Sequence, residues 1–261
     1  MRIGKGERMK KSAFITGAAS GTGYAIAERF AKEGYNVFLG SRSIEQAQKA
    51  AKEISEKFNI HAEGCETSQF TESEVGRIFE YISKCGYSID SIVLNAANLG
   101  INQKSLDVDI DEFMSVYKVN VAWNFMMARA AAKMMIKKNG GSIVFVTSNS
   151  AIRVTRDRCA YCSSKSAILA MSKSFAVDWG KYRIRSNCVL PGMIKTERWR
   201  KNENHIQESL PNFTPLEDIA EFEDIADAVW YFASDESRNV TGAELVVDGG
   251  MLAQLTPEIK K

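Results

Sequence analysis

The sequence predicts an α/β fold built on a doubly wound parallel β-sheet of about seven strands with helices on both faces. Short β-branched runs alternate with longer segments whose apolar residues recur at three- and four-residue spacing, which is typical of strands followed by amphipathic helices. A glycine-rich turn directly follows the first of these runs. Because crossovers between parallel strands are right-handed and helices must cover both faces, we expect a Rossmann-type sheet.

Each expected strand is a short apolar run, and most are followed by an amphipathic segment of helical period. In chain order the elements are strand 12–16 with helix 21–33, strand 36–40 with helix 45–58, strand 60–66 with helix 71–85, strand 91–95 with helix 110–138, strand 141–147 with helix 163–180, and the strands 183–190 and 243–247. This alternation indicates a parallel sheet.

The chain shows no internal repeat, low-complexity tract or domain linker. We expect a flexible basic leader at residues 1–11 and a single dinucleotide-binding catalytic domain at 12–261. The least regular stretch, 195–217, contains Pro211 and Pro215 and follows the carboxyl end of a strand, where open α/β sheets bind ligands. A substrate lid and a variable surface loop are both open interpretations of this stretch.

Composition excludes several classes of function. The chain has 261 residues, of which 45% are hydrophobic and 25% charged, and a formal net charge of +2, too small and too evenly spread for a nucleic-acid partner. No run approaches the roughly 20 apolar residues of a membrane span, so no membrane partner is expected. Five scattered cysteines suit free thiols in a reducing cytoplasm, and we expect a cytoplasmic protein.

Cys159 and Cys162 form a Cys-x-x-Cys pair that encloses Tyr161. The two histidines, His61 and His205, lie far away in sequence, and no second cysteine pair completes a zinc site, so no metal is expected. Inert packing and a redox role are both open for the two thiols.

The first turn has the composition of a phosphate-binding loop. Gly17, Gly21 and Gly23 lie between the first strand and the first helix, so the backbone can bring amide donors and the helix N-terminus toward a pyrophosphate. At the end of the second strand, Arg42 lies between Ser41 and Ser43, where enzymes that use NAD have an acid. A guanidinium suits a 2′-phosphate, so we predict NADP(H) rather than NAD(H).

Tyr161 and Lys165 are one helical turn apart and therefore share a helix face. A hydride transfer to a carbonyl carbon generates an alkoxide, which requires a proton donor. Free tyrosine has a pKa near 10, and a neighbouring ammonium would lower it, so the pair suits proton transfer.

These motifs, in this order, resemble the short-chain dehydrogenase/reductase family over nearly the whole chain. The matching segments are Thr16-Gly17 through Gly23, Asn120 within Tyr117-Lys118-Val119-Asn120-Val121, Ser148, Tyr161 with Lys165, Pro191 through Thr196, and the closing Thr241-Gly242 and Asp248-Gly249-Gly250. The resemblance implies the catalytic residues Asn120, Ser148, Tyr161 and Lys165. Ser150 competes with Ser148, which has the family spacing of thirteen residues before Tyr161.

The resemblance also assigns roles and a cofactor site. Lys165 would hold the nicotinamide ribose, Asn120 would anchor a water for proton exchange, and Ser148 would donate a hydrogen bond to the substrate oxygen. Together with the turn analysis, it assigns the cofactor to Gly17, Ser20, Gly21, Thr22, Gly23, Ser41, Arg42, Ser43, Glu66, Asn95, Ala96, Ala97, Tyr161, Lys165, Pro191, Gly192, Ile194 and Thr196.

Three positions depart from the family pattern. Asn95-Ala96-Ala97-Asn98 stands where the family has Asn-Asn-Ala-Gly, and asparagine can keep a left-handed turn. Glu66 replaces an aspartate that faces the adenine, and Thr22 replaces an aliphatic residue in the glycine turn.

The function expected is interconversion of a ketone or aldehyde carbonyl and an alcohol on a small molecule, by a homotetramer or homodimer as the family implies. The alternative is a catalytically inactive dinucleotide-binding sensor or scaffold, which would have lost some of the four catalytic residues that this chain keeps. A cationic rim could recruit an anionic substrate or be a solvated surface paired with nearby acids; its residues are Arg153, Arg156, Arg158, Arg198, Arg200 and Lys201.

Overall fold

The structure is a computed structural model that describes residues 10–196 and 214–256. Most of the expected leader, 1–9, and most of the expected lid, 197–213, lie outside the described residues.

The described strands form one parallel sheet in the order β3-β2-β1-β4-β5-β6-β7, which confirms the doubly wound fold. Their bounds are β1 Ser12–Thr16, β2 Asn36–Ser41, β3 Ala62–Glu66, β4 Ser91–Leu94, β5 Gly141–Val146, β6 Ile184–Pro191 and β7 Glu244–Val247. The crossovers diverge between β1 and β4, so the carboxyl ends of these neighbours border a crevice in which such sheets bind ligands.

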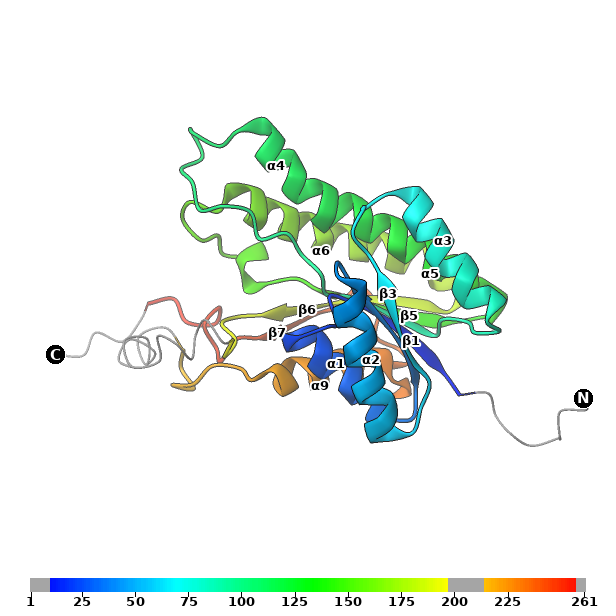
Figure 1. The fold of residues 1–261 in the computed structure, drawn as a ribbon. Coiled ribbons are helices and arrows are strands. Elements are labelled where there is room, and N and C mark those ends of the chain that lie inside the picture. Colours follow the sequence, from blue (N-terminus) through cyan, green and yellow to red (C-terminus); the bar gives the residue numbers. More distant parts are fainter. Residues whose placement is uncertain (1–9, 197–213, 257–261) are drawn as a thin grey trace, which may run out of the picture.

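Helices cover both faces of the sheet (Figure 1). One face carries α1 (Gly21–Lys32), α2 (Ile44–Phe58) and α9 (Phe222–Ala233), and the other carries α3 (Glu72–Lys84), α4 (Ile110–Tyr117), α5 (Asn124–Lys137) and α6 (Cys159–Trp179). Successive strand side chains point to opposite faces, so Ala13 and Ile15 enter one core while Phe14 enters the other.

The expected helix 110–138 is interrupted once. A π-helical turn, Lys118–Trp123, joins α4 to α5 and carries Asn120. Wide turns of this kind occur mostly at functional sites, because the extra residue re-aims nearby side chains and carbonyl groups.

Two helices differ from the sequence prediction. Helix α6 begins at Cys159, four residues earlier than expected, so Tyr161 and Lys165 both lie within it. Helix α9 was not expected, although Ile225, Val229 and Phe232 have helical spacing and are buried. Glu221 and Asp224 form a reciprocal capping box at its start, a signal that is visible in the sequence.

Candidate active site

The glycine turn packs too closely for side chains. A Cβ atom on Gly23 would overlap the carbonyl oxygen of Gly17, and one on Gly17 would lie 3.1 Å from the Asn95 amide. Gly17 and Gly21 also have positive φ angles of 65° and 56°. The turn therefore brings its backbone close to the residues that follow β4.

The start of α1 can accept an anion. Ser20 is its N-cap residue but makes no side-chain capping bond, and the first turn contains no acidic residue. By contrast, Ser43, Thr71 and Asp109 cap α2, α3 and α4 through their side chains. The first amides of α1 and the positive end of its dipole thus suit a pyrophosphate.

A cavity of 1010 Å³ lies at the carboxyl ends of the strands and adjoins this turn. It is lined by Gly17, Ala19, Ser20, Ser41, Arg42, Ser43, Gln46, Thr67, Phe70, Asn95, Ala96, Ala97, Asn98, Leu99 and Val119. Eight of these were assigned to the cofactor from the sequence. The cavity is large enough for a dinucleotide's adenosine and pyrophosphate portions.

Glu66 and Thr67 line two different cavities. Glu66 lines a neighbouring hollow and accepts a 2.7 Å hydrogen bond from the Ser68 hydroxyl, whereas buried Thr67 lines the cofactor cavity. The loop beyond them is held by Glu74, a buried carboxylate that accepts hydrogen bonds from the amides of residues 68, 69 and 70. Sequence analysis missed Glu74, because its partners precede the helix on which it lies.

Arg42 is exposed at the cavity wall and has no hydrogen-bond or ionic partner among the described residues. Ser43 caps α2 by accepting a 3.2 Å bond from the Gln46 amide and donates a 2.7 Å bond to Glu45. That second bond lowers the pKa of Glu45. The Arg42 guanidinium therefore borders the cavity, whereas Glu45 does not line it.

Ser148 and Tyr161 meet beyond the carboxyl end of β5. The Ser148 hydroxyl lies close enough to the Tyr161 phenol to lower its pKa. The competing Ser150 has its hydroxyl 3.4 Å from that of Thr155 instead. The structure thus brings Ser148 rather than Ser150 to the tyrosine.

Lys165 lies beneath this pair and is 3% exposed. Its Nζ donates a 3.1 Å bond to the Val146 carbonyl oxygen and lies 5.7 Å from the centroid of the Tyr161 ring. Burial lowers the pKa of Lys165 to about 8. Its ammonium is thus directed at the end of β5 and only distantly at the phenol.

The pKa of Tyr161 reflects several neighbours. Burial raises it above the ordinary value of 10.0, while the Ser148 hydroxyl and the charge of Arg158 act to lower it. Arg158 is therefore a second cation, besides Lys165, that lies near the phenol.

Arg158 holds its position through two further contacts. Its guanidinium carbon lies 4.7 Å from the Tyr161 ring centroid, and its nitrogens donate to the Asn102 side chain at 2.7 Å and to the Leu99 carbonyl at 2.8 Å. Of the other rim cations, Arg153 bonds the Gln254 carbonyl at 2.9 Å, and Arg156 is exposed. Arg198, Arg200 and Lys201 lie outside the described residues.

Asn120 is fully buried and clamps the loop after β4. Its oxygen accepts from the Asn98 amide at 2.8 Å, and its nitrogen donates to the Asn98 carbonyl and to the Ser164 hydroxyl, both at 2.9 Å. Asn98 does not have a positive φ angle, which corrects the expectation of a left-handed turn there. The side chain of Asn120 therefore links the cofactor cavity to α6.

The segment after β6 is held against β7 and its surroundings. Gly192 donates to the Val247 carbonyl at 2.9 Å, and a Cβ atom there would lie 2.5 Å from that of Asp248. Ile194 pairs with Ala220, and the Thr196 amide bonds the Ile194 carbonyl at 2.7 Å. Together with Pro191, these residues continue along the carboxyl edge of the sheet.

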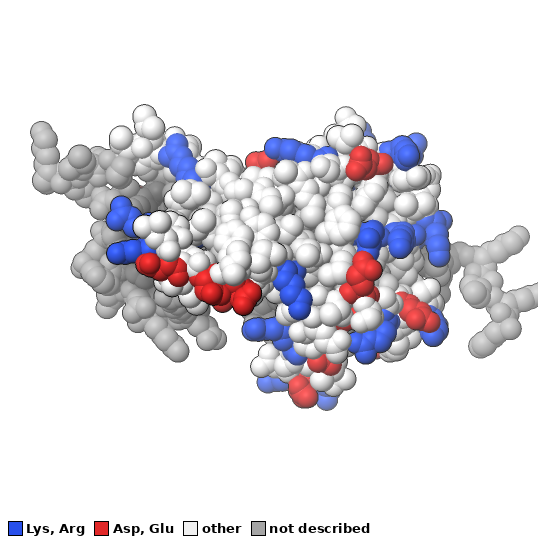
Figure 2. Space-filling view, turned by 90° about the horizontal axis from the view of Figure 1, so that it is seen from above, with Lys and Arg blue, Asp and Glu red and all other residues white. Residues whose placement is uncertain are grey.

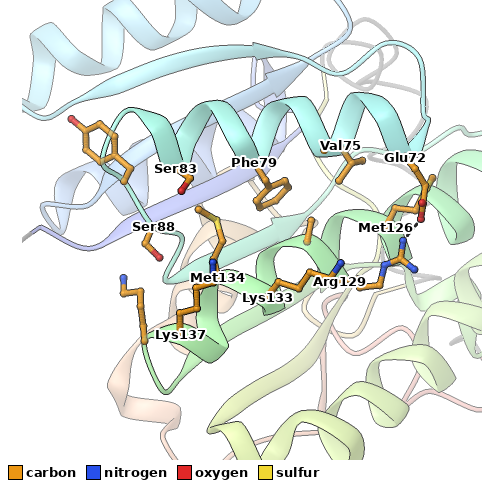
Figure 3. Close-up of a pocket in the computed structure, with 14 residues that line it drawn as sticks. Glu72, Val75, Phe79, Ser83, Ser88, Met126, Arg129, Lys133, Met134 and Lys137 are labelled. Carbon is orange, nitrogen blue, oxygen red and sulfur yellow. Dashed lines mark hydrogen bonds and ion pairs between the residues drawn. The ribbon is translucent and has the colours of Figure 1, made fainter.

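Residues 10–196 and 214–256 contain neither a disulfide bond nor a group of potential metal ligands. All five cysteines are free thiols, with Cys162 buried and Cys159 exposed. No three His, Cys, Asp or Glu side chains in these ranges are grouped to hold a metal, and no helix there is long and apolar enough to cross a membrane. A groove of 540 Å³ between α3 and α5, floored by Phe79 and Met126 (Figure 3), contains none of the expected site residues.

A doubly wound sheet with a glycine turn, a cavity at its switch point and a Ser–Tyr–Lys constellation beside it defines a class, the Rossmann-type oxidoreductases. The family model described as "Enoyl-(Acyl carrier protein) reductase" matches residues 17–252. The chain belongs to the short-chain dehydrogenase/reductase family, whose enzymes interconvert CH–OH and C=O groups.

Individual relatives agree with this assignment. A 7alpha-hydroxysteroid dehydrogenase of Clostridium sardiniense is 36% identical over 251 residues, covering 92% of each chain. A short-chain type dehydrogenase/reductase from Mycobacterium marinum has a TM-score of 0.86 and 30% identity, covering 94% of this chain and 96% of that one. L-Sorbose reductase from Gluconobacter frateurii, complexed with NADPH and L-sorbose, has a TM-score of 0.89 and 28% identity, covering 94% and 98%.

Proposed function

We propose that the protein is an NADP(H)-dependent oxidoreductase that interconverts a ketone or aldehyde carbonyl and an alcohol, with Tyr161 as general acid and base. The observation that carries the proposal is the juxtaposition of Ser148, Tyr161 and the buried Lys165 at the carboxyl edge of the sheet that also carries the cavity of the glycine turn. An inactive sensor is not favoured, because such a protein would not need a buried lysine and a serine around the phenol.

The cofactor fits the residues present. The uncapped start of α1 would hold its pyrophosphate, Arg42 its 2′-phosphate, and the part of the cavity between the carboxyl ends of β2 and β4 its adenosine. When bound, the nicotinamide supplies or accepts the hydride. The choice of NADP(H) is supported by a guanidinium with no acidic partner among the described residues and by the absence of an acid at position 42.

The protein's side chains then perform the proton chemistry. Ser148 donates a hydrogen bond to the substrate oxygen, where charge develops, and Tyr161 delivers or removes the proton at the same atom. Lys165 offers its ammonium to a ribose hydroxyl, and Asn120 maintains the spacing between the cofactor loop and α6 through Asn98 and Ser164.

We infer that the substrate is a neutral ketone or its secondary alcohol. Two of the three described rim arginines, Arg153 and Arg158, already direct N–H groups at protein carbonyl oxygens, which leaves fewer of their donors for an anion. Two relatives are named for molecules with such groups, a hydroxysteroid and L-sorbose.

The five free thiols support a reducing, cytoplasmic setting.

A substrate panel with NADPH and NADH tests the proposal. We expect kcat/KM to be higher with NADPH, and Arg42→Gln to reduce it about tenfold or more with NADPH only, since a charged hydrogen bond contributes roughly 1.5–3 kcal/mol. Tyr161→Phe should abolish turnover while NADPH binding, measured by fluorescence titration, stays within about twofold. Substantial turnover by Tyr161→Phe, or a preference for NADH, would contradict the proposal.

A further inference from the structure

A polar cavity of 540 Å³ opens at the amino-terminal edge of the sheet. Its walls include Gly141 and Ser142 of β5 and Ile184 of β6. Because Ser148 follows the opposite end of β5, six residues of extended chain, about 20 Å, separate this cavity from the candidate active site.

Cationic side chains outnumber carboxylates around this cavity. The cations are Lys11, Lys138, Arg183, Arg185 and Arg238, and the carboxylates are Asp90 and Asp235. The lining therefore has an excess of three positive charges, although the whole chain has a net charge of only +2. Such an excess, focused in a concave site, favours an anionic ligand.

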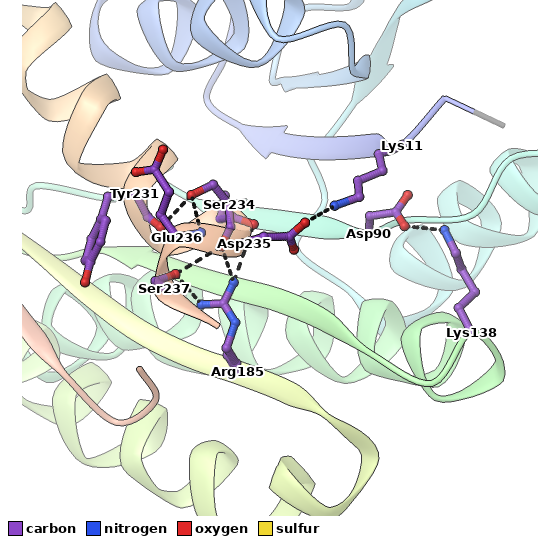
Figure 4. A network of polar contacts seen from close by, with 10 residues as sticks. Lys11, Asp90, Lys138, Arg185, Tyr231, Ser234, Asp235, Glu236 and Ser237 are labelled. Atoms are coloured by element: carbon purple, nitrogen blue, oxygen red, sulfur yellow. Dashed lines mark hydrogen bonds and ion pairs between the residues drawn. The ribbon is translucent and has the colours of Figure 1, made fainter. Parts of the chain in front are cut away.

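The protein uses three of these cations itself (Figure 4). Lys11 pairs with Asp235 at 3.4 Å, and Lys138 pairs with Asp90. Arg185 donates to the Phe232 carbonyl and to the Ser237 hydroxyl, both at 2.7 Å, at the end of α9. The two lysine ion pairs therefore involve both carboxylates of the lining, Asp235 and Asp90.

Arg183 and Arg238 are left without an acidic partner among the described residues. Both are exposed and line the cavity. The Tyr35 hydroxyl also has no hydrogen-bond partner in the described ranges, although its ring is buried against Phe30 and Trp230. Two guanidinium groups and a phenol are therefore free to donate.

We propose that this cavity binds a small anion of the phosphate class, with two or more negative charges, through Arg183 and Arg238. Guanidinium groups match phosphate oxygens with paired N–H donors, and the excess of three charges exceeds what a single carboxylate would neutralise. The volume is larger than one phosphate ion needs and accommodates pyrophosphate or a phosphate ester. The proposal does not depend on the proposed function, because the cofactor cavity shares no lining residue with this one.

Calorimetric titration with inorganic pyrophosphate tests the site. The titration uses Arg42→Gln protein, which removes the guanidinium of the cofactor cavity, and any pyrophosphate bound at the start of α1 would form a separate site that Arg183 and Arg238 do not affect. We expect one pyrophosphate site in this background to be weakened at least tenfold when Arg183→Gln and Arg238→Gln are added. Adding Arg156→Gln instead, an exposed arginine outside both cavities, should leave the affinity unchanged within about twofold.

Two outcomes would overturn the site: no pyrophosphate binding to the Arg42→Gln protein, or equal binding with and without the two cavity arginines. Circular dichroism melting verifies that each variant is folded. A parallel titration with glycerol 3-phosphate and inorganic phosphate identifies the source, since tighter binding of either one in an Arg183- and Arg238-dependent manner supports the site and names an ester or the free ion as its ligand.

Discussion

At the scale of single residues, Tyr161 is controlled by neighbours that lie on different parts of the chain. Burial raises its pKa, and Ser148 and Arg158 oppose that effect. Arg158 is three residues away, yet its position over the ring depends on Asn102 and Leu99 in the loop after β4. The loop that borders the 1010 Å³ cavity thus also positions a charge at the Tyr161 phenol.

Replacing Arg158 by glutamine should change the pH dependence of the reaction. Alcohol oxidation requires ionised Tyr161, so kcat/KM rises with pH through the pKa of this group, and losing a nearby cation should move that rise upward by roughly one unit. Steady-state profiles of oxidation measure the shift. Arg156→Gln, which removes another exposed arginine, should leave the profile in place; equal profiles for Arg158→Gln and the wild type would refute the role.

Lys165 should lower the stability of the fold. Its folded-state pKa of about 8 lies below the ordinary 10.5, so the unfolded chain binds the proton more tightly. The penalty is fully present below pH 8, amounts to about 3 kcal/mol, and disappears as pH rises toward 10.5. Lys165→Met should therefore raise the free energy of unfolding in urea by about 2 kcal/mol at pH 7.

The pH series provides the control for Lys165. The stability difference between Lys165→Met and the wild type should shrink steadily between pH 8 and 10, because the wild-type lysine loses its proton there. A difference that does not vary with pH would mean that packing and not charge sets it.

At the scale of elements, replacing two glycines by alanine should have opposite effects on stability, because their surroundings differ. Gly23→Ala should abolish cofactor binding and destabilise the protein, because its Cβ would overlap the Gly17 carbonyl oxygen. Gly76→Ala lies inside α3 with nothing within 4 Å of its Cβ, so it should stabilise by about 0.5–1 kcal/mol. Denaturant unfolding and NADPH titration measure both. Normal NADPH affinity in Gly23→Ala would show that the turn tolerates a side chain.

At the scale of the whole molecule, the helices on one face carry exposed apolar residues. Ile110 and Met114 on α4, Phe125 on α5 and Val177 on α6 are between 38% and 81% exposed, and Met114 and Val121 line a hollow of 600 Å³. Figure 2, seen from above this layer, shows a broad area without Lys, Arg, Asp or Glu. We propose that this face joins copies of the chain into a homodimer or homotetramer.

Met114→Asp should shift the oligomer toward the monomer, because a carboxylate in an apolar interface costs several kcal/mol. Light scattering coupled to size-exclusion chromatography gives the mass. Leu106→Asp is the control, since Leu106 is 96% exposed outside the helices. A wild-type protein that runs as a monomer would exclude the interface.

The sequence by itself determined the alternation of strands and helices along the chain, the doubly wound parallel sheet and the turn of Gly17 and Gly23, because these depend on local periodicity and on residues close in the chain. It also indicated Tyr161 and Lys165 as a pair, one helical turn apart. The tertiary structure decided the contacts around the candidate site: Arg158 over the Tyr161 ring, Asn98 bonded to Asn120, and Glu74 holding the loop after β3. Those contacts depend on where a loop or helix end packs, and the spacing of residues along the chain does not predict that packing. The same reason explains why the excess charge around Arg183 and Arg238, contributed by five separate segments, is visible only in the folded chain.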